Sequence, residues 1–171
     1  MENKVTTPAI KGIIISLVLI VFALALQFLD LSKNKAVGSL QFLFLVGALI
    51  WSCVSYAKQL DGNVTFGNVF AHGFKTAAAI TAIMVVYTVI SLKFINPEAL
   101  DIALREARTN MEAKNMSDDQ TETAINFTKK FFLPLAIGGT LFIFLFIGLI
   151  GSLIGAAVAK KNPAGPFVQQ A

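Results

Sequence analysis

The chain has 171 residues, of which 56% are apolar and only 14% are charged, and its mean hydropathy is +0.71. An ordinary soluble domain has about 25% charged residues, so this composition indicates an integral membrane protein. The net charge is +4, but the Lys and Arg residues are dispersed and form no basic stripe with interleaved aromatic residues. This dispersion argues against nucleic acid as a partner.

The first apolar run covers residues 12–29 and follows Lys4 and Lys11. It contains Ala23-Leu24-Ala25, a small-x-small triplet typical of a cleavage site, so a secretory signal is one interpretation. The run continues past this triplet to Leu29, whereas the apolar core of a signal is about 7 to 15 residues long. We therefore favour a retained transmembrane helix. A cleaved signal would leave three spans, with the termini on opposite sides of the membrane.

Three further runs approach the length of about 20 residues that a helix needs to cross a hydrocarbon core. The third run of the chain is short, and we expect helix to extend it through Lys75 and Lys93, whose side chains can reach the interface. The fourth is long and is expected to tilt or to begin its membrane portion at Pro134. The predicted spans are residues 12–29, 37–57, 70–94 and 133–159.

The segment 96–130 is the only sizeable part predicted outside the membrane. Asn96-Pro97-Glu98 is typical of a helix start, with Asn96 as the capping residue. Asn115-Met116 interrupts this helix, and Ser117 and Gln120 form a capping-box pattern that opens a second helix towards the fourth span. We expect an extramembrane helical hairpin. Its narrow apolar stripe favours closure against its own second helix over a dedicated docking surface.

These runs predict an all-α membrane protein with one four-helix domain over residues 1–171 and a flexible tail at 160–171. Four spans place both termini on one side. That side carries six lysines against two carboxylates, and the other side carries eight Lys or Arg against eight carboxylates. The raw counts do not decide the orientation, but the compact lysines beside the first, second and fourth spans favour cytoplasmic termini.

The four apolar runs themselves, residues 12–29, 36–57, 76–92 and 131–159, contain no Asp, Glu, Lys, Arg or His. Ionisable groups at membrane depth usually mark ion, proton or substrate pathways, so this pattern argues against a proton-coupled transporter. It also argues against an intramembrane hydrolase. We therefore predict no catalytic residue, no metal site and no cofactor. Cys53, the single cysteine, is expected to be a buried, inert thiol.

Residues 60–76 gather polar side chains, among them the only His, between two apolar runs. Asp61-Gly62 is typical of a turn, and Thr65 is placed to cap the helix that follows. We interpret the stretch as a capped, interfacial helix start with a Lys anchor and a solvated His. The alternative is a contact with an anionic lipid or phosphate through Lys58, His72 and Lys75.

The fourth span carries two adjacent rows of small residues. One row is Gly148, Ser152 and Ala156, and the other is Gly151, Gly155 and Ala159. Such rows let helix backbones approach closely in lipid and gain dispersion contacts. We favour packing inside the four-helix bundle over a dimer or a heteromeric contact, because these patterns are common in membrane helices.

Several short motifs follow one another along the chain. They are Gly62-Asn-Val-Thr65-Phe-Gly67 with Gly73, then Ile95-Asn-Pro97-Glu98, then Met116-Ser-Asp-Asp-Gln120, then Phe131 with a proline before the glycine-rich last span. In this order, and with four spans, the chain resembles a family of Bacteroidota multi-span membrane proteins, domain of unknown function 4199. The resemblance covers nearly the whole chain. It implies a location in the bacterial inner (cytoplasmic) membrane and brings no established activity, cofactor or catalytic residue.

Three functions from different classes are considered. The first is a non-enzymatic accessory or scaffolding subunit of an envelope complex, which contacts membrane lipid and binds a protein partner or a second copy through the last span or the hairpin. The second is a small lipid or lipid-linked-sugar translocator, or a membrane partner of a glycosyltransferase. The third is an enzyme that uses the hairpin acids and His72. We favour the first and disfavour the third, because the hairpin and His72 are expected on opposite faces of the membrane.

Overall fold

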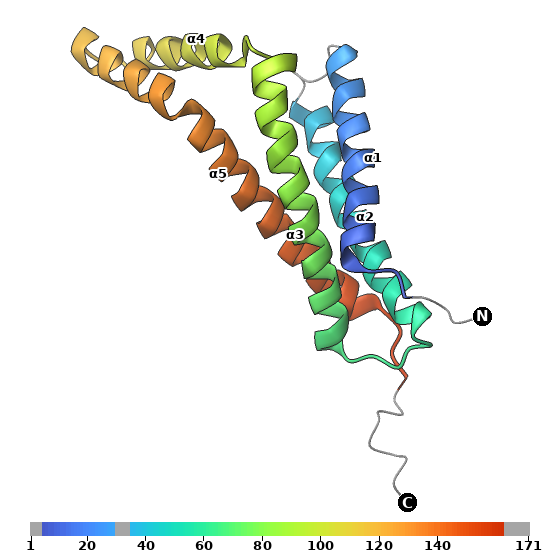
Figure 1. The fold of residues 1–171 in the computed structure, drawn as a ribbon. Helices are drawn as coiled ribbons and strands as arrows, with labels where there is room; N and C mark the ends of the chain where they lie inside the picture. The colour runs from blue at the N-terminus through green and yellow to red at the C-terminus, as the bar shows by residue number, and fades with distance from the viewer. Residues whose placement is uncertain (1–4, 30–34, 163–171) are drawn as a thin grey trace, which may run out of the picture. The chain divides into compact units, whose positions relative to one another are not determined.

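The computed structural model describes residues 5–29 and 35–162, and the regular elements in those ranges are helices (Figure 1). They are α1 (Pro8–Phe28), α2 (Lys35–Gln59), α3 (Phe66–Ile90), the π-helical turn η2 (Ser91–Ile95), α4 (Ala99–Glu112) and α5 (Asp118–Val158). Four helices are long and apolar enough to cross a membrane: α1, α2 from Gly38, α3 continued by η2, and α5. The prediction of an all-α protein with four membrane-spanning candidates is confirmed.

Contacts between residues divide the chain into two compact units. The first unit consists of Met1–Met84 and Phe142–Ala171, and therefore holds α1, α2, most of α3 and the C-terminal part of α5. The second unit is Val85–Leu141, which holds the end of α3, η2, α4 and the beginning of α5.

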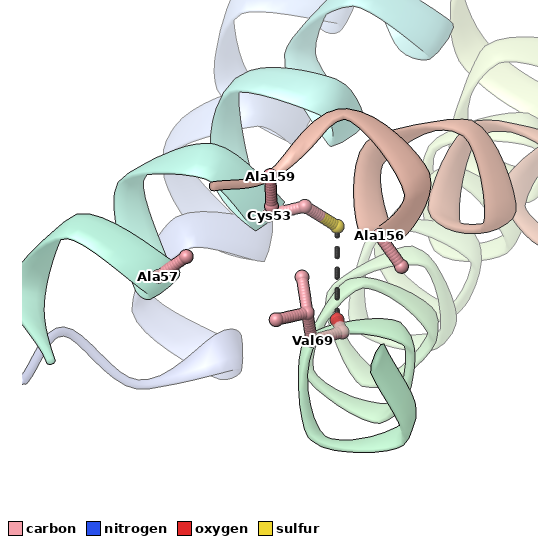
Figure 2. Packing of buried hydrophobic residues seen from close by; sticks show 5 residues of the cluster. All are labelled: Cys53, Ala57, Val69, Ala156 and Ala159. Carbon is pink, nitrogen blue, oxygen red and sulfur yellow. Dashed lines mark hydrogen bonds between the residues drawn. The ribbon is translucent and has the colours of Figure 1, made fainter. Parts of the chain in front are cut away.

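Small side chains fill the contact between α2, α3 and α5 in the first unit (Figure 2). Cys53 and Ala57 come from α2, Val69 from α3 and Ala156 from the end of α5, Ala159 directly follows α5, and all are buried. Because these side chains are short, the three helices can approach closely. The Cys53 thiol donates a weak hydrogen bond to the Val69 carbonyl oxygen over 3.7 Å. The prediction of a buried thiol at Cys53 is confirmed.

The turn between α2 and α3 follows the predicted chemistry. The Gly62 amide donates to the Ala57 carbonyl over 2.9 Å, which closes the end of α2, and Asp61 and Gly62 both adopt positive φ. Thr65 then caps α3, because its hydroxyl accepts a hydrogen bond from the Asn68 amide over 3.2 Å. The predicted turn at Asp61-Gly62 and the predicted cap at Thr65 are both confirmed.

The residues that follow α5 are bonded to this turn. The Asn162 amide donates to the Gly62 carbonyl over 2.9 Å, and the Asn162 side chain donates to the Asp61 carbonyl over 2.5 Å. The Lys161 ammonium donates to the carbonyl of Ala156 over 2.6 Å, which satisfies an acceptor that the helix end leaves free. The first residues of the predicted flexible tail are thus anchored. The rest of it, residues 163–171, lies outside the described residues.

In the second unit the helix after the third span begins later than predicted. α4 begins at Ala99, with Glu98 at the N-cap position and without a side-chain cap. Asn96 instead closes the preceding element, since its amide donates to the Ser91 carbonyl over 2.7 Å at the end of η2. The prediction of Asn96 as the helix cap is wrong, because helix extends from the third span up to Ile95 and takes the Asn96 amide as its last donor.

The turn between α4 and α5 agrees with the sequence pattern. Asn115 adopts positive φ, and the Met116 amide donates to the Met111 carbonyl over 3.2 Å, an arrangement that ends α4. Ser117 and Gln120 form the reciprocal bonds of a capping box at 3.4 Å each. α5 then continues through Pro134 to Val158 as one helix. The position of these elements outside the membrane stays a prediction.

Candidate functional site

Seven polar side chains among the described residues of the first unit are buried, each at most 5% exposed, and two of them are Ser16 and Thr81. We call the other five the buried polar layer, and they are Lys11, Ser52, His72, Thr76 and Ser152. The Lys11 ammonium donates to the Ser52 carbonyl over 3.0 Å, and the Ser52 and Thr76 hydroxyls lie 3.4 Å apart. The Thr76 hydroxyl donates to the His72 carbonyl over 2.9 Å. The layer thus connects α1, α2 and α3 through polar contacts.

Lys11 lies inside the bundle because α1 begins before it. Thr7 is the N-cap residue, its hydroxyl accepts a hydrogen bond from the Ile10 amide over 3.4 Å, and Pro8 occupies the start of the helix. The sequence interpretation treated Lys11 as a residue that flanks the span, and it expected no ionisable group at membrane depth. The absence of ionisable groups at membrane depth stays a prediction, but Lys11 and His72 are both buried within helices able to span. Thr7-Pro8 is the sequence signal that was available for the earlier helix start.

The charge on Lys11 needs compensation, because a cation inside an apolar helix bundle is costly. The Ser52 carbonyl accepts one of its hydrogen bonds, and the ammonium lies 5.8 Å from the centroid of the Trp51 ring. An aromatic face attracts a cation at that distance. An ionisable side chain inside a membrane protein is a candidate functional residue by default.

His72 is buried rather than solvated as predicted, with 5% of its surface exposed. Its imidazole stacks on the Tyr56 ring, with centroids 4.1 Å apart and an interplanar angle of 15°. The Nε2 atom has no hydrogen-bond partner among the residues that the structure describes. A buried polar atom without a partner is rare in folded proteins, so this nitrogen calls for an explanation.

The depth of the layer follows from the helix ends. α3 begins at Phe66, six residues before His72, and α2 ends at Gln59, seven residues after Ser52. At a rise of 1.5 Å per residue, the layer lies about 10 Å inside this end of the bundle. The layer is therefore within reach of groups that approach from that end.

A pocket of about 350 Å³ adjoins the layer, and we call it the N-terminal pocket. Its lining residues are Val5, Thr6, Thr7, Pro8, Tyr56, Asn68, Ala71, His72 and Lys75. Gln59 holds the N-terminal segment in place, since its side-chain oxygen accepts from the Thr6 amide over 2.8 Å and its side-chain nitrogen donates to the Thr6 hydroxyl over 3.3 Å. The pocket is thus bounded by α2, α3 and the segment that precedes α1.

The N-terminal pocket is electropositive. Lys75 is exposed beside it, and the lining residues within 5–29 and 35–162 include no Asp or Glu. The first turns of α1 and α3 also contribute lining residues, and a helix N-terminus carries partial positive charge. These features suit an anionic group better than a cationic one.

Of the three residues in the alternative anion-contact interpretation, the structure places two together. His72 and Lys75 line the N-terminal pocket, whereas Lys58 lines a separate pocket of about 530 Å³ with Asp61, Lys160 and other residues. Asp61 provides a negative charge in that second pocket. Within residues 5–29 and 35–162, no group of three or more His, Cys, Asp or Glu residues is arranged to hold a metal ion.

A family model described as "Protein of unknown function (DUF4199)" matches residues 11–161. The chain belongs to this family. The match confirms the resemblance inferred from the order of the short motifs. No match was found among curated proteins or among solved structures. Lys11 and Lys161, which both donate to backbone carbonyls in the first unit, are the first and last residues of the matched range.

In this DUF4199 protein the small residues of the last span lie against other helices of the first unit. A Cβ atom added at Gly148 would lie 2.6 Å from the Ala77 Cβ, and one added at Gly155 would lie 2.8 Å from the Cys53 Cβ. Ser152, Ala156 and Ala159 are buried, and the Cβ of an added side chain at Gly151 would lie 3.1 Å from Leu49. Much of both rows is thus occupied by contacts within the chain.

Proposed function

We propose that this DUF4199 protein is a non-enzymatic accessory or scaffolding subunit of an envelope complex, which binds a partner protein through its second unit. The observation that carries the proposal is an apolar groove of about 600 Å³ beside the turn between α4 and α5. The groove is lined by Met116, Asp119, Gln120, Thr123, Ala124, Phe127 and Thr128. The Phe127 side chain is 55% exposed there.

An aromatic side chain in this position supports a protein contact. The rings of Phe127 and Phe131 have centroids 4.6 Å apart and together form an exposed aromatic surface. If segment 96–130 lies outside the membrane, as predicted, the Phe127 part of this surface faces water rather than lipid. Exposed apolar patches rimmed by polar residues mark binding sites in aqueous surroundings, and aromatic residues commonly anchor such contacts. The partner that fits is a protein with an apolar helix face, which the groove would cover.

Affinity purification of the full chain in mild detergent tests the proposal. We expect the wild type to retain a stoichiometric partner, and Phe127→Ala to reduce its recovery at least tenfold, because the groove loses its aromatic anchor. Phe142→Ala is the matched control, since Phe142 is also exposed but lies in the first unit, within the predicted fourth span. This variant should retain the partner. Equal recovery with both variants would refute the groove as the docking site.

A second candidate function is a small translocator of lipids or lipid-linked sugars, or a membrane partner of a glycosyltransferase. It is favoured by one observation that the sequence interpretation lacked, namely that Lys11 and His72 are buried inside candidate spans beside an electropositive pocket. Such groups are expected along a pathway for anionic head groups. In the same purification, a homo-oligomer without another protein but with co-purified anionic lipid would reject the accessory role and support this function.

We also propose that the protein lies in the bacterial inner membrane with cytoplasmic termini. The lysines near span ends on the terminal side support this orientation. On a Cys53→Ser background, Asn110→Cys should react with an impermeant thiol reagent added outside spheroplasts, because position 110 is expected on the outer side. Lys160→Cys is the control and should react only after the membrane is opened. The reverse pattern of labelling would overturn the orientation.

A further inference from the structure

We propose that the N-terminal pocket binds a phosphate-bearing anion, with His72 and Lys75 as the groups that recognise it. The inference deepens the second candidate function and rests on it for the role of the anion, but its test measures binding alone. If the pocket binds no anion, the binding test fails. If the pocket binds an anion but the protein moves no lipid, the binding test succeeds and only the second candidate function fails. The partner-binding proposal concerns the other unit and is not affected by either result.

The first step of the argument is the unpartnered nitrogen of His72. The side chain is 95% buried and lines the pocket, yet Nε2 has no hydrogen-bond partner among the described residues. The stacked Tyr56 ring restrains the imidazole plane, so the ring cannot turn freely to find solvent. A ligand oxygen in the adjoining pocket would give this nitrogen the partner that buried polar groups usually have.

The second step is the charge around the pocket. Lys75 follows His72 by three residues on α3, so both side chains project from one face of the helix towards the same pocket. The first turns of α1 and α3 add the positive ends of two helices, and no carboxylate is among the described residues that line the cavity. Phosphate groups bind where helix N-termini and basic side chains meet in this way.

The third step is the supply of neutral hydrogen-bonding groups and the size of the cavity. Asn68, Thr6 and Thr7 line the pocket beside His72 and Lys75. A cavity of about 350 Å³ has room for a phosphate group with the first atoms of a substituent. Phosphate has several acceptor oxygens, so it can use these separate donors at once.

The pocket around Lys58 provides the natural comparison. It also contains lysines, at positions 58 and 160, but Asp61 lines it as well. A carboxylate beside the lysines lowers the attraction for an anion. Lys58→Gln therefore removes the same charge as Lys75→Gln from the same unit and leaves the proposed site intact, which makes it the matched control.

The test is equilibrium binding to the full chain, purified in an uncharged maltoside detergent. One arm adds inorganic phosphate at constant ionic strength, and the other adds dihexanoyl phosphatidylglycerol, with dihexanoyl phosphatidylcholine as its control. Thermal unfolding and the fluorescence of Trp51, the only tryptophan, are the readouts. Trp51 is a suitable reporter because its ring lies 5.8 Å from the Lys11 ammonium in the adjoining layer.

We expect saturable binding by the wild type in at least one arm. Lys75→Gln should weaken the Kd at least tenfold, while Lys58→Gln should change it less than twofold. His72→Phe keeps the aromatic stack but loses both ring nitrogens, so it should also weaken the Kd at least tenfold. His72→Gln keeps a donor near the position of Nε2 and should weaken binding less than His72→Phe does.

The two arms identify the source of the anion. Saturation with inorganic phosphate supports a soluble phosphate compound, and saturation with phosphatidylglycerol alone supports a lipid head group. Absence of saturable binding in both arms would overturn the proposal, as would equal losses in Lys75→Gln and Lys58→Gln. Lys75 is exposed, so its variant should fold normally and keep the test decisive if the His72 variants do not fold.

Discussion

Gly148→Ala should lower the free energy of unfolding by about 2 kcal/mol or more, which is the cost of overpacking a close helix contact. The added methyl would lie 2.6 Å from the Ala77 Cβ, where two methyl groups cannot coexist. Neither side chain can rotate away, because both Cβ atoms are fixed to helix backbones. Relief therefore requires α5 to move away from α3 in the first unit. Denaturation in mixed micelles with increasing sodium dodecyl sulfate measures the change.

Two further variants isolate this contact. Ala77→Gly in the Gly148→Ala background transfers the methyl from α3 to α5 and should recover most of the lost stability. Gly139→Ala places a methyl on the same helix where no described atom lies within 4 Å, so it should be neutral or stabilise by up to about 1 kcal/mol. An equal loss in Gly139→Ala and Gly148→Ala would mean that helix α5, and not this contact, is sensitive to substitution.

Lys11→Ala should cost about 3 kcal/mol of unfolding free energy, similar to other truncations of large buried side chains. The Lys11 side chain is 1% exposed, so its removal leaves a cavity between α1 and α2. Lys11→Met retains most of the volume and removes the charge. It should cost less than about 1 kcal/mol or stabilise, because the desolvation penalty of a buried cation disappears with the charge. The Ser52 carbonyl lies within α2 and keeps its helical acceptor role.

The same micelle denaturation separates volume from charge. A loss in Lys11→Met as large as that in Lys11→Ala would show that the ammonium itself stabilises the bundle, contrary to this account. If Lys11→Met stays folded, it also becomes a clean probe of function. A loss of co-purified anionic lipid in that variant would then follow from the charge and not from unfolding.

Local signals explain why much of the fold could be predicted from the sequence. The four apolar runs identified the helices that can span a membrane, and Thr65 and the Ser117/Gln120 pair marked two helix starts through bonds within one turn. Asn96 misled the prediction because the same residue can begin one helix or end another. Local sequence does not decide between these roles, since that depends on how far the preceding helix extends.

The candidate site could be predicted less well, because burial depends on contacts between distant segments. Lys11 directly precedes a run of uncharged residues, so the sequence indicated a position at the end of a membrane span. Its burial depends on contacts with Ser52 and Trp51, which lie 41 and 40 positions later in the chain. Similarly, Lys58 and Lys75 look equivalent in sequence near span ends. The structure separates them because they line different pockets.

Lys11 is an interior residue of the helix bundle, with 1% of its surface exposed. Amine acylation of the folded protein in detergent, followed by peptide mass spectrometry, tests it directly, with Lys75 and Lys160 as exposed internal controls. We expect Lys11 to remain unmodified while Lys75 and Lys160 react, and to react at their rate once the protein is unfolded in sodium dodecyl sulfate. Modification of Lys11 in the folded protein as fast as that of Lys160 would show that Lys11 is exposed to solvent and not inside the bundle.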